Sequence, residues 1–126
     1  MNNLSIVLST YNEANNIRQA LTKLVDKDSI KEIIIIDDNS TDGTVGIIKD
    51  FNKDKIKLFI RRNTRGFASA FIFGIIISKE DYILRFDIDM HLEIDFFMNA
   101  FEKNRDRDCV IFSRYVKNGN DLRGSY

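Results

Sequence analysis

The stretch that decides the fold is Ile33-Ile34-Ile35-Ile36-Asp37-Asp38-Asn39-Ser40, four β-branched residues followed at once by four polar ones. An unbroken β-branched run predicts a strand that is covered on both faces, as strands of parallel sheets are. Sheets of this kind bind ligands where the carboxyl ends of their strands open into a crevice. The stretch therefore predicts a buried strand with a polar site at its end.

Strand-like and helix-like segments alternate on both sides of this stretch. An apolar run at residues 4–9 predicts a strand, and apolar residues at helical spacing after Glu13 predict a helix that Asn12 would cap. Further helices are expected from the 40–44 turn to about residue 52, over residues 66–78 and over 94–101, and further strands over 56–60, 82–86 and 108–112. This alternation predicts one α/β domain over residues 1–126, with a mainly parallel sheet and helices on both faces.

The composition excludes several classes of protein. Nineteen basic and nineteen acidic side chains give no net charge, so nothing favours bulk attraction to nucleic acid. The longest apolar segment, residues 67–77, is too short to cross a bilayer and is expected to form a helix buried on most sides. The start of the chain lacks a signal-peptide pattern. The single cysteine, Cys109, is expected in a buried strand and fits a reducing, cytoplasmic compartment.

Asp87 and Asp89 follow the apolar run that ends at Phe86. Side chains two positions apart along a strand point the same way, about 6–7 Å apart. Two neighbouring anions favour a cation between or beside them, and at such a strand end a hard divalent metal is expected. His91, two positions further on, is a candidate third ligand, with a surface or capping role as its alternative. A solvated pair of loop aspartates is the alternative for Asp87 and Asp89.

The ends of the other strands carry further candidates. Asp37 and Asp38 are adjacent, so only one of them easily points into the crevice, where it would accept a hydrogen bond from a ribose or a base; a helix-capping turn is the alternative. Tyr11 would stack on a nucleobase and Glu13 would accept from it, unless Tyr11 only covers the sheet edge. Arg114 matches a pair of diphosphate oxygens, or is simply solvated.

Two features lie around the expected helix over residues 66–78. The basic segment 61–66 precedes it and would either stabilise phosphate or form a solvated loop. Gly66, Ala70 and Gly74 are spaced four apart, and we expect these small residues to let the helix pack closely on the sheet.

Taken in order, these clusters resemble family 2 glycosyltransferases of the GT-A fold, and within them the dolichol- or polyprenyl-phosphate mannose synthase branch. The matching residues are 9–13, 36–44, Gly66 with Ala70 and Gly74, Asp87-Ile88-Asp89 and 113–117. The resemblance spans nearly the whole chain and implies a Rossmann-like domain that binds a nucleotide sugar. Relatives continue beyond the position of Tyr126, so we expect the C-terminal acceptor part to be missing, in a fragment or a short natural form.

The resemblance also implies an activity: metal-dependent transfer of a sugar, with inversion, from GDP-mannose or a UDP-sugar to an acceptor such as polyprenyl phosphate. Mg²⁺ or Mn²⁺ would neutralise the departing nucleoside diphosphate. The implied metal ligands are Asp89, His91 and Asp87, and the implied catalytic residues are Asp87, Asp89 and Arg114. The implied nucleotide contacts are Thr10, Tyr11, Glu13, Ile36, Asp38, Asp87, Ile88 and Arg114.

Other classes of protein fit less well. A receiver domain needs its acidic pair after the first strand, and a haloacid-type phosphatase needs its D-x-D there, whereas here these motifs follow the second and fourth expected strands. A non-catalytic module that binds a nucleotide sugar, or serves assembly, remains the alternative. We expect a cytoplasmic location, including the cytoplasmic face of a membrane, and a bare sheet edge would favour homo-oligomers.

Overall fold

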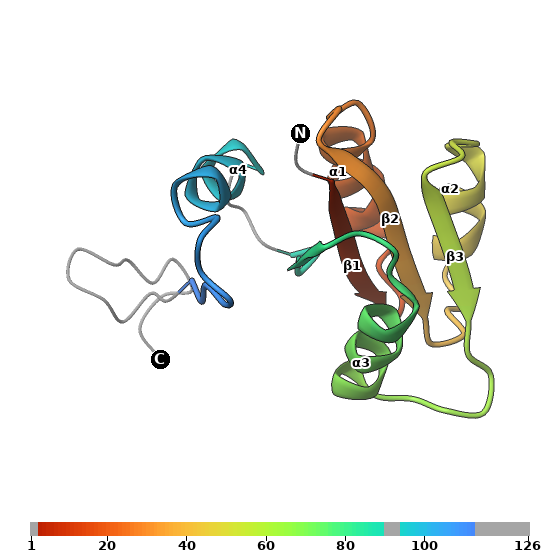
Figure 1. Ribbon diagram of the computed structural model, residues 1–126. Helices are drawn as coiled ribbons and strands as arrows, with labels where there is room; N and C mark the ends of the chain where they lie inside the picture. Colours follow the sequence, from red (N-terminus) through yellow and green to blue (C-terminus); the bar gives the residue numbers. More distant parts are fainter. Residues whose placement is uncertain (1–2, 90–93, 113–126) are drawn as a thin grey trace, which may run out of the picture. The chain divides into compact units, whose positions relative to one another are not determined.

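The computed structural model describes residues 3–89 and 94–112, and its contacts divide the chain into two compact units, residues 1–91 and 92–126. The first unit holds a four-stranded sheet whose strands all run parallel, in the order β3-β2-β1-β4 (Figure 1). The strands are β1 (Leu4–Thr10), β2 (Ile30–Asp37), β3 (Ile56–Ile60) and β4 (Tyr82–Arg85).

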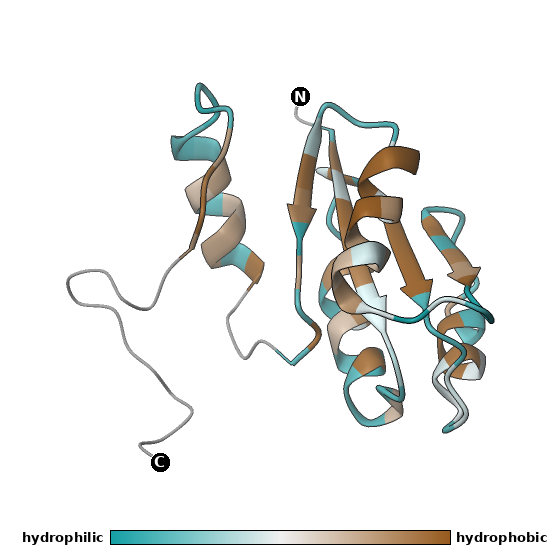
Figure 2. Ribbon diagram, turned by 90° about the horizontal axis from the view of Figure 1, so that it is seen from below, coloured by the Kyte–Doolittle hydropathy of each residue, from teal (hydrophilic) through white to brown (hydrophobic). Residues whose placement is uncertain are grey.

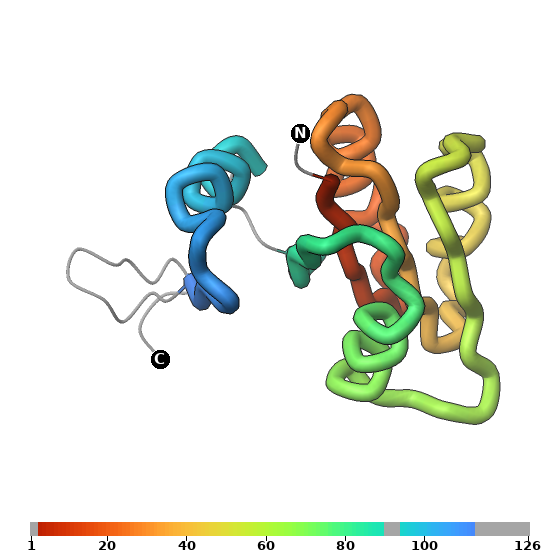
Figure 3. Tube along the Cα trace, viewed as in Figure 1, coloured from red at the N-terminus to blue at the C-terminus, as the bar shows by residue number. Residues whose placement is uncertain are grey.

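The path of the chain reverses its direction across the sheet at β1. From β1 the chain moves outward to β2 and β3, and then returns past both to β4 on the other side of β1 (Figure 3). Right-handed crossovers therefore place α1 (Ala14–Val25) and α2 (Thr44–Asp50) on one face and α3 (Phe67–Ile77) on the other (Figures 1 and 2). The predicted α/β fold is confirmed, and the reversal between β1 and β4 is a topological switch point.

The two central strands form the core. The β-branched run of β2, Ile33 to Ile36, is at most 1% exposed, as expected for a strand covered on both faces. Val7, Ile34 and Ile36 pack with Ala70 and Phe71 of α3 on one face of the sheet. On the other face α1 contributes its predicted apolar stripe, with Ile17, Ala20, Leu21, Leu24 and Val25 buried.

Helix α3 packs closely on the sheet along one stripe only. Gly74 lies against Val7 so tightly that an added Cβ would overlap the valine side chain, and Ala70 is fully buried, as predicted for these small residues. The prediction that the helix is buried on most sides is wrong: Ile72 is 59% and Ile76 74% exposed. A helix lying on a sheet buries only the stripe that faces it, so apolar residues of α3 outside that stripe are exposed. Figure 2 shows that α3 is hydrophobic along most of its length.

No helix in the described ranges, 3–89 and 94–112, has both the length and the apolar character needed to cross a bilayer.

The second unit is described over residues 94–112 and contains α4 (Ile94–Lys103). The rings of Phe97 and Phe112 pack edge to face within it, with centroids 4.7 Å apart. The strand predicted over residues 108–112 is not formed, and Cys109 is exposed rather than buried. A strand needs a hydrogen-bonded neighbour, and the described part of this unit offers one helix and no strand.

Candidate functional site

A cavity of about 360 Å³ lies at the carboxyl ends of the strands, around the switch point. Its walls come from the end of β1, from the segments that follow β1, β2 and β4, and from the start of α3 with the residues just before it. The lining residues are Ser9, Tyr11, Glu13, Asp38, Arg65, Gly66, Phe67, Asp87, Ile88 and Asp89. The polar clusters predicted from separate stretches of sequence therefore converge on one crevice within the first unit.

Hydrogen bonds between two loops shape the wall formed by β1 and β2. The backbone N–H of Asn12 donates to Ser40 Oγ at 2.8 Å, and the N–H of Thr41 donates to Asn12 Oδ1 at 2.9 Å. The prediction that Asn12 caps α1 is wrong, because its side chain accepts from the neighbouring loop instead. Asn12 also has a positive φ of 53°. Asparagine tolerates this left-handed conformation better than most residues.

Side chains of the β2–α2 loop and of the first residue of α2 cap the start of α1. The N–H of Glu13 donates to Thr44 Oγ1 at 2.9 Å, and the N–H of Ala14 donates to Asp42 Oδ2 at 3.0 Å. The other oxygen of Asp42 accepts from the hydroxyl and the N–H of Thr44. The hydroxyl of Thr44 has the largest effect and lowers the pKa of Asp42. Burial has the next largest effect and raises it, and the N–H groups of Ala14, Thr44 and Asp42 lower it further, so the pKa lies below its ordinary value.

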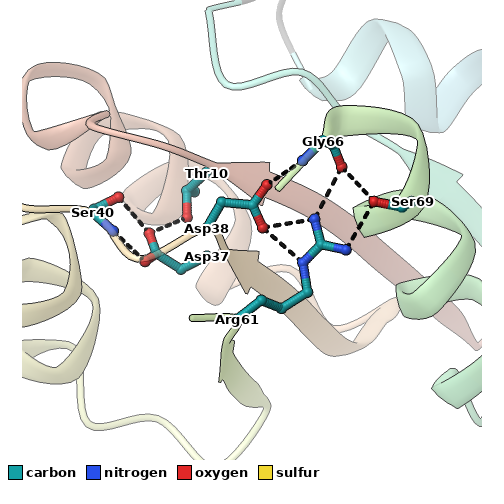
Figure 4. A network of polar contacts seen from close by, with 7 residues as sticks. All are labelled: Thr10, Asp37, Asp38, Ser40, Arg61, Gly66 and Ser69. Carbon is teal, nitrogen blue, oxygen red and sulfur yellow. Dashed lines mark hydrogen bonds and ion pairs between the residues drawn. The ribbon is translucent and has the colours of Figure 1, made fainter. Parts of the chain in front are cut away.

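Asp37 and Asp38 have separate roles, as their adjacency predicted (Figure 4). Asp37 is fully buried, and its carboxylate accepts from Thr10 Oγ1 at 2.7 Å and from Ser40 Oγ and N at 2.6 and 2.8 Å. Asp37 therefore ties together the ends of β1 and β2. Asp38 is the one that lines the cavity.

The carboxylate of Asp38 already has strong partners. Its Oδ1 accepts from Arg61 Nε and Nη2, both at 2.7 Å, and its Oδ2 accepts from the N–H of Gly66 at 2.9 Å (Figure 4). Arg61 also donates to the Gly66 carbonyl and to Ser69 Oγ, both at 2.9 Å. Gly66 has a φ of 142°, a conformation that favours glycine. This network joins the end of β2 to the start of α3.

The cavity also holds a stacked pair, Arg65 on Tyr11. The guanidinium carbon of Arg65 lies 3.5 Å from the centroid of the Tyr11 ring. The predicted basic segment therefore divides: Arg61 holds Asp38, whereas Arg65 reaches the cavity. Of the described residues, Arg65 is the one basic residue that lines the cavity. The only sequence signal for this role was the basic segment that precedes α3.

Asp87, Ile88 and Asp89 leave β4 at the opposite wall of the cavity. Arg85 Nη2 lies 3.2 Å from Asp87 Oδ1 and 3.4 Å from Oδ2. The sequence interpretation did not assign a role to Arg85 or to Phe67, whose ring it contacts.

Other predicted site residues lie elsewhere. Ile36 is fully buried in the core and the Thr10 hydroxyl bonds to Asp37, so neither residue lines the cavity. His91 and Arg114 lie outside the described residues. The nucleotide roles implied for Ile36 and Thr10 stay predictions.

The cavity offers a limited set of candidate ligands for a divalent cation. Within residues 3–89 and 94–112, no group of three or more His, Cys, Asp or Glu side chains is arranged to hold a metal ion. Asp87 and Asp89 supply two carboxylates, the hard oxygen ligands that Mg²⁺ and Mn²⁺ prefer. They fit a cation whose remaining ligands come from a phosphorylated molecule and water.

The chain belongs to the glycosyl transferase family 2, whose family model matches residues 5–126. The predicted resemblance to this family is thus confirmed.

Relatives of known function are much longer than this chain. Poly-beta-1,6-N-acetyl-D-glucosamine synthase of Staphylococcus epidermidis is 30% identical in an alignment of 126 positions, gaps included, that covers 96% of this chain and 31% of that protein. Dolichol-phosphate mannosyltransferase of Saccharomyces cerevisiae is 28% identical over 119 residues, which cover 89% of this chain and 45% of that protein. Their similar identities do not single out the predicted dolichol-phosphate branch.

Solved structures share the fold. The mannosyltransferase PcManGT from Pyrobaculum calidifontis, in complex with GDP-Man and Mn²⁺, superposes with a TM-score of 0.69 at 22% identity, over 80% of this chain and 32% of that one. Glucosyl-3-phosphoglycerate synthase from Mycobacterium tuberculosis, with Mn²⁺, UDP and its product, gives 0.59 at 21% identity, over 70% and 34% of the two chains.

Proposed function

We propose that this chain forms the donor-binding part of a glycosyltransferase, and that its cavity takes a nucleoside-diphosphate sugar together with Mg²⁺ or Mn²⁺. The observation that carries the proposal is the convergence of Tyr11, Glu13, Asp38, Asp87 and Asp89 on one cavity at the switch point. Membership of the glycosyl transferase family 2 supports it. So do two similar folds solved with Mn²⁺ and a GDP-sugar or UDP.

The side chains on the β1 wall and on the β4 wall of the cavity have different roles in this proposal. At the β1 wall, Glu13 is partly exposed and accepts base or ribose N–H and O–H groups. Asp38 is paired with Arg61 and accepts from the N–H of Gly66, so its main role is to hold the start of α3 in place beside the nucleotide. A direct hydrogen bond from the nucleotide would use the lone pairs of Asp38 that these partners leave available. At the β4 wall, Asp87 and Asp89 line the cavity and would hold the cation beside the diphosphate. When bound, the cation supplies charge neutralisation for the departing nucleoside diphosphate.

The acceptor and the stereochemistry are a finer part of the proposal. A polyprenyl phosphate is already an anionic nucleophile, so its attack at the anomeric carbon, with inversion, needs no strong general base. The similarity to dolichol-phosphate mannosyltransferase favours this acceptor, although the chain spans less than half of that protein.

Calorimetry tests donor binding. GDP and UDP are titrated into the chain with and without Mn²⁺, and the same titrations are run with Asp89→Ala. We expect one of the nucleotides to bind in a metal-dependent way, and that dependence to be lost in the variant. Asp54→Ala is the control, because Asp54 is an exposed aspartate that does not line the cavity. Failure of both nucleotides to bind would refute the proposal.

Transfer of a labelled sugar to a polyprenyl phosphate tests the acceptor separately. Binding without transfer would favour the alternative of a non-catalytic module.

A further inference from the structure

Arg85 and Asp87 form an ion pair at the end of β4, beside the proposed donor site. One guanidinium nitrogen of Arg85 lies 3.2 and 3.4 Å from the two carboxylate oxygens of Asp87. The two side chains are 51% and 36% exposed, and a pair this open to water adds little to stability by itself.

What sets the pair apart is its aromatic support. The guanidinium carbon of Arg85 lies 4.4 Å from the ring centroid of Phe67 and 4.5 Å from that of Phe71. These two rings are one helical turn apart on α3 and pack edge to face at 4.6 Å. Contacts of a guanidinium with aromatic rings restrain an otherwise flexible side chain and leave its N–H groups free to donate. Arg85 is thus held in place beside Asp87.

The ion pair reduces the negative charge that the empty site presents to a cation. Without Arg85, the two aspartates after β4 would form an acidic pair that attracts a divalent ion by itself. With Arg85 in place, the charge of Asp87 is compensated. Among the described residues, Asp89 forms no ion pair, so it is the one carboxylate of the two whose charge is left uncompensated.

We propose that Arg85 is a positioning residue that prevents Asp87 from binding a divalent cation until a nucleotide is present. The cation then enters together with the diphosphate, whose oxygens complete its coordination. This inference rests on the proposed function, because it assigns an order to the binding of metal and donor at that same site.

The test is the affinity of the nucleotide-free protein for Mn²⁺ alone. Arg85→Met removes the charge and keeps an apolar stem against Phe67 and Phe71. We expect Mn²⁺ to bind this variant about tenfold more tightly at low ionic strength. The reason is that repulsion between one positive charge and a divalent ion roughly 6 Å away weakens binding by about tenfold, even at the dielectric constant of water. Structural damage would change the affinity in the opposite direction.

Arg85→Lys is the matched control, because it retains the positive charge and should leave the affinity for Mn²⁺ near that of the unchanged protein. Arg85→Gln is a second neutral variant, used if Arg85→Met does not fold. Adding Asp87→Asn to the neutral variant should abolish the gain. An unchanged or weaker affinity in the folded neutral variants, or no measurable Mn²⁺ binding in any variant, would overturn the inference. The nucleotide titrations judge the proposed function independently of this result.

Discussion

Arg61 and Asp38 form an ion pair that is largely shielded from water, with side chains only 14% and 5% exposed. Arg61 follows β3, Asp38 follows β2, and both contact Gly66 at the start of α3. Removing one partner of a buried pair leaves the other charge uncompensated. We expect Arg61→Met to lower the free energy of unfolding by about 3 kcal/mol in chemical denaturation.

Arg62→Met is the control for this change, because the neighbouring Arg62 is exposed. It should alter the free energy of unfolding by less than about 0.5 kcal/mol. Equal effects of the two substitutions would show that Asp38 does not depend on Arg61. Donor binding by folded Arg61→Met should also weaken, since Asp38 and Gly66 both line the cavity.

The contact of Gly74 with Val7 gives a second prediction. An added Cβ at residue 74 would overlap the Val7 side chain, so α3 would have to move away from β1. We expect Gly74→Ala to cost about 1–3 kcal/mol of unfolding free energy, as overpacking of a core does. The measurement is the midpoint and slope of urea denaturation.

Gly46→Ala is the matched control within α2. A Cβ at Gly46 would meet nothing within 4 Å, and its φ is not positive. The better helix propensity of alanine should then stabilise the protein by up to about 1 kcal/mol. If Gly74→Ala were equally stabilising, the close contact of α3 with β1 would be refuted.

Regular elements were predictable because they depend on local periodicity. The β-branched run of β2 and the apolar stripe of α1 each identify a buried surface within one segment. The four parallel strands and their polar ends follow from the alternation of such segments. The same local reasoning failed for residues 108–112, because an apolar run forms a strand only where a partner strand is available.

The contacts between distant segments were not predictable. Adjacency showed that Asp37 and Asp38 would differ, but only their spatial partners decide which lines the cavity. Arg61 and Arg65 belong to one basic run, yet one holds a carboxylate and the other stacks on Tyr11. These roles depend on which side chains the fold brings close, and a single sequence carries no record of that.

Asp42 predicts a dependence of stability on pH. Its pKa lies below the ordinary value of 3.8, chiefly because the hydroxyl of Thr44 donates to its carboxylate. A carboxyl group with a lowered pKa in the folded state stabilises the protein above its unfolded pKa, and this contribution is lost as the pH falls through the folded value. We expect Asp42→Asn to lower the melting temperature at neutral pH, and the difference to shrink as the pH falls below 3.8.

Thermal unfolding over a series of pH values measures this effect, with Asp54→Asn as the control because Asp54 is exposed. A difference between Asp42→Asn and the unchanged protein that stays constant into strong acid would contradict the assignment. It would mean that the amide and the ionised carboxylate serve equally well at the start of α1.

Glu32 holds the opposite end of the sheet and gives the last prediction. Its side chain on β2 is only 3% exposed, and its Oε1 accepts from Ser5 Oγ and from the N–H of Lys79, both at 2.6 Å. Glu32→Ala would leave both donors without this acceptor, so we expect a loss of about 2–3 kcal/mol in unfolding free energy. Glu32→Gln keeps a carbonyl oxygen in the same place and should recover part of the loss. Asp81→Ala, at an exposed carboxylate near by in the sequence, should change little. Should the glutamine variant be as unstable as the alanine variant, the negative charge of Glu32, rather than its acceptor geometry, would be what joins β1, β2 and the segment before β4.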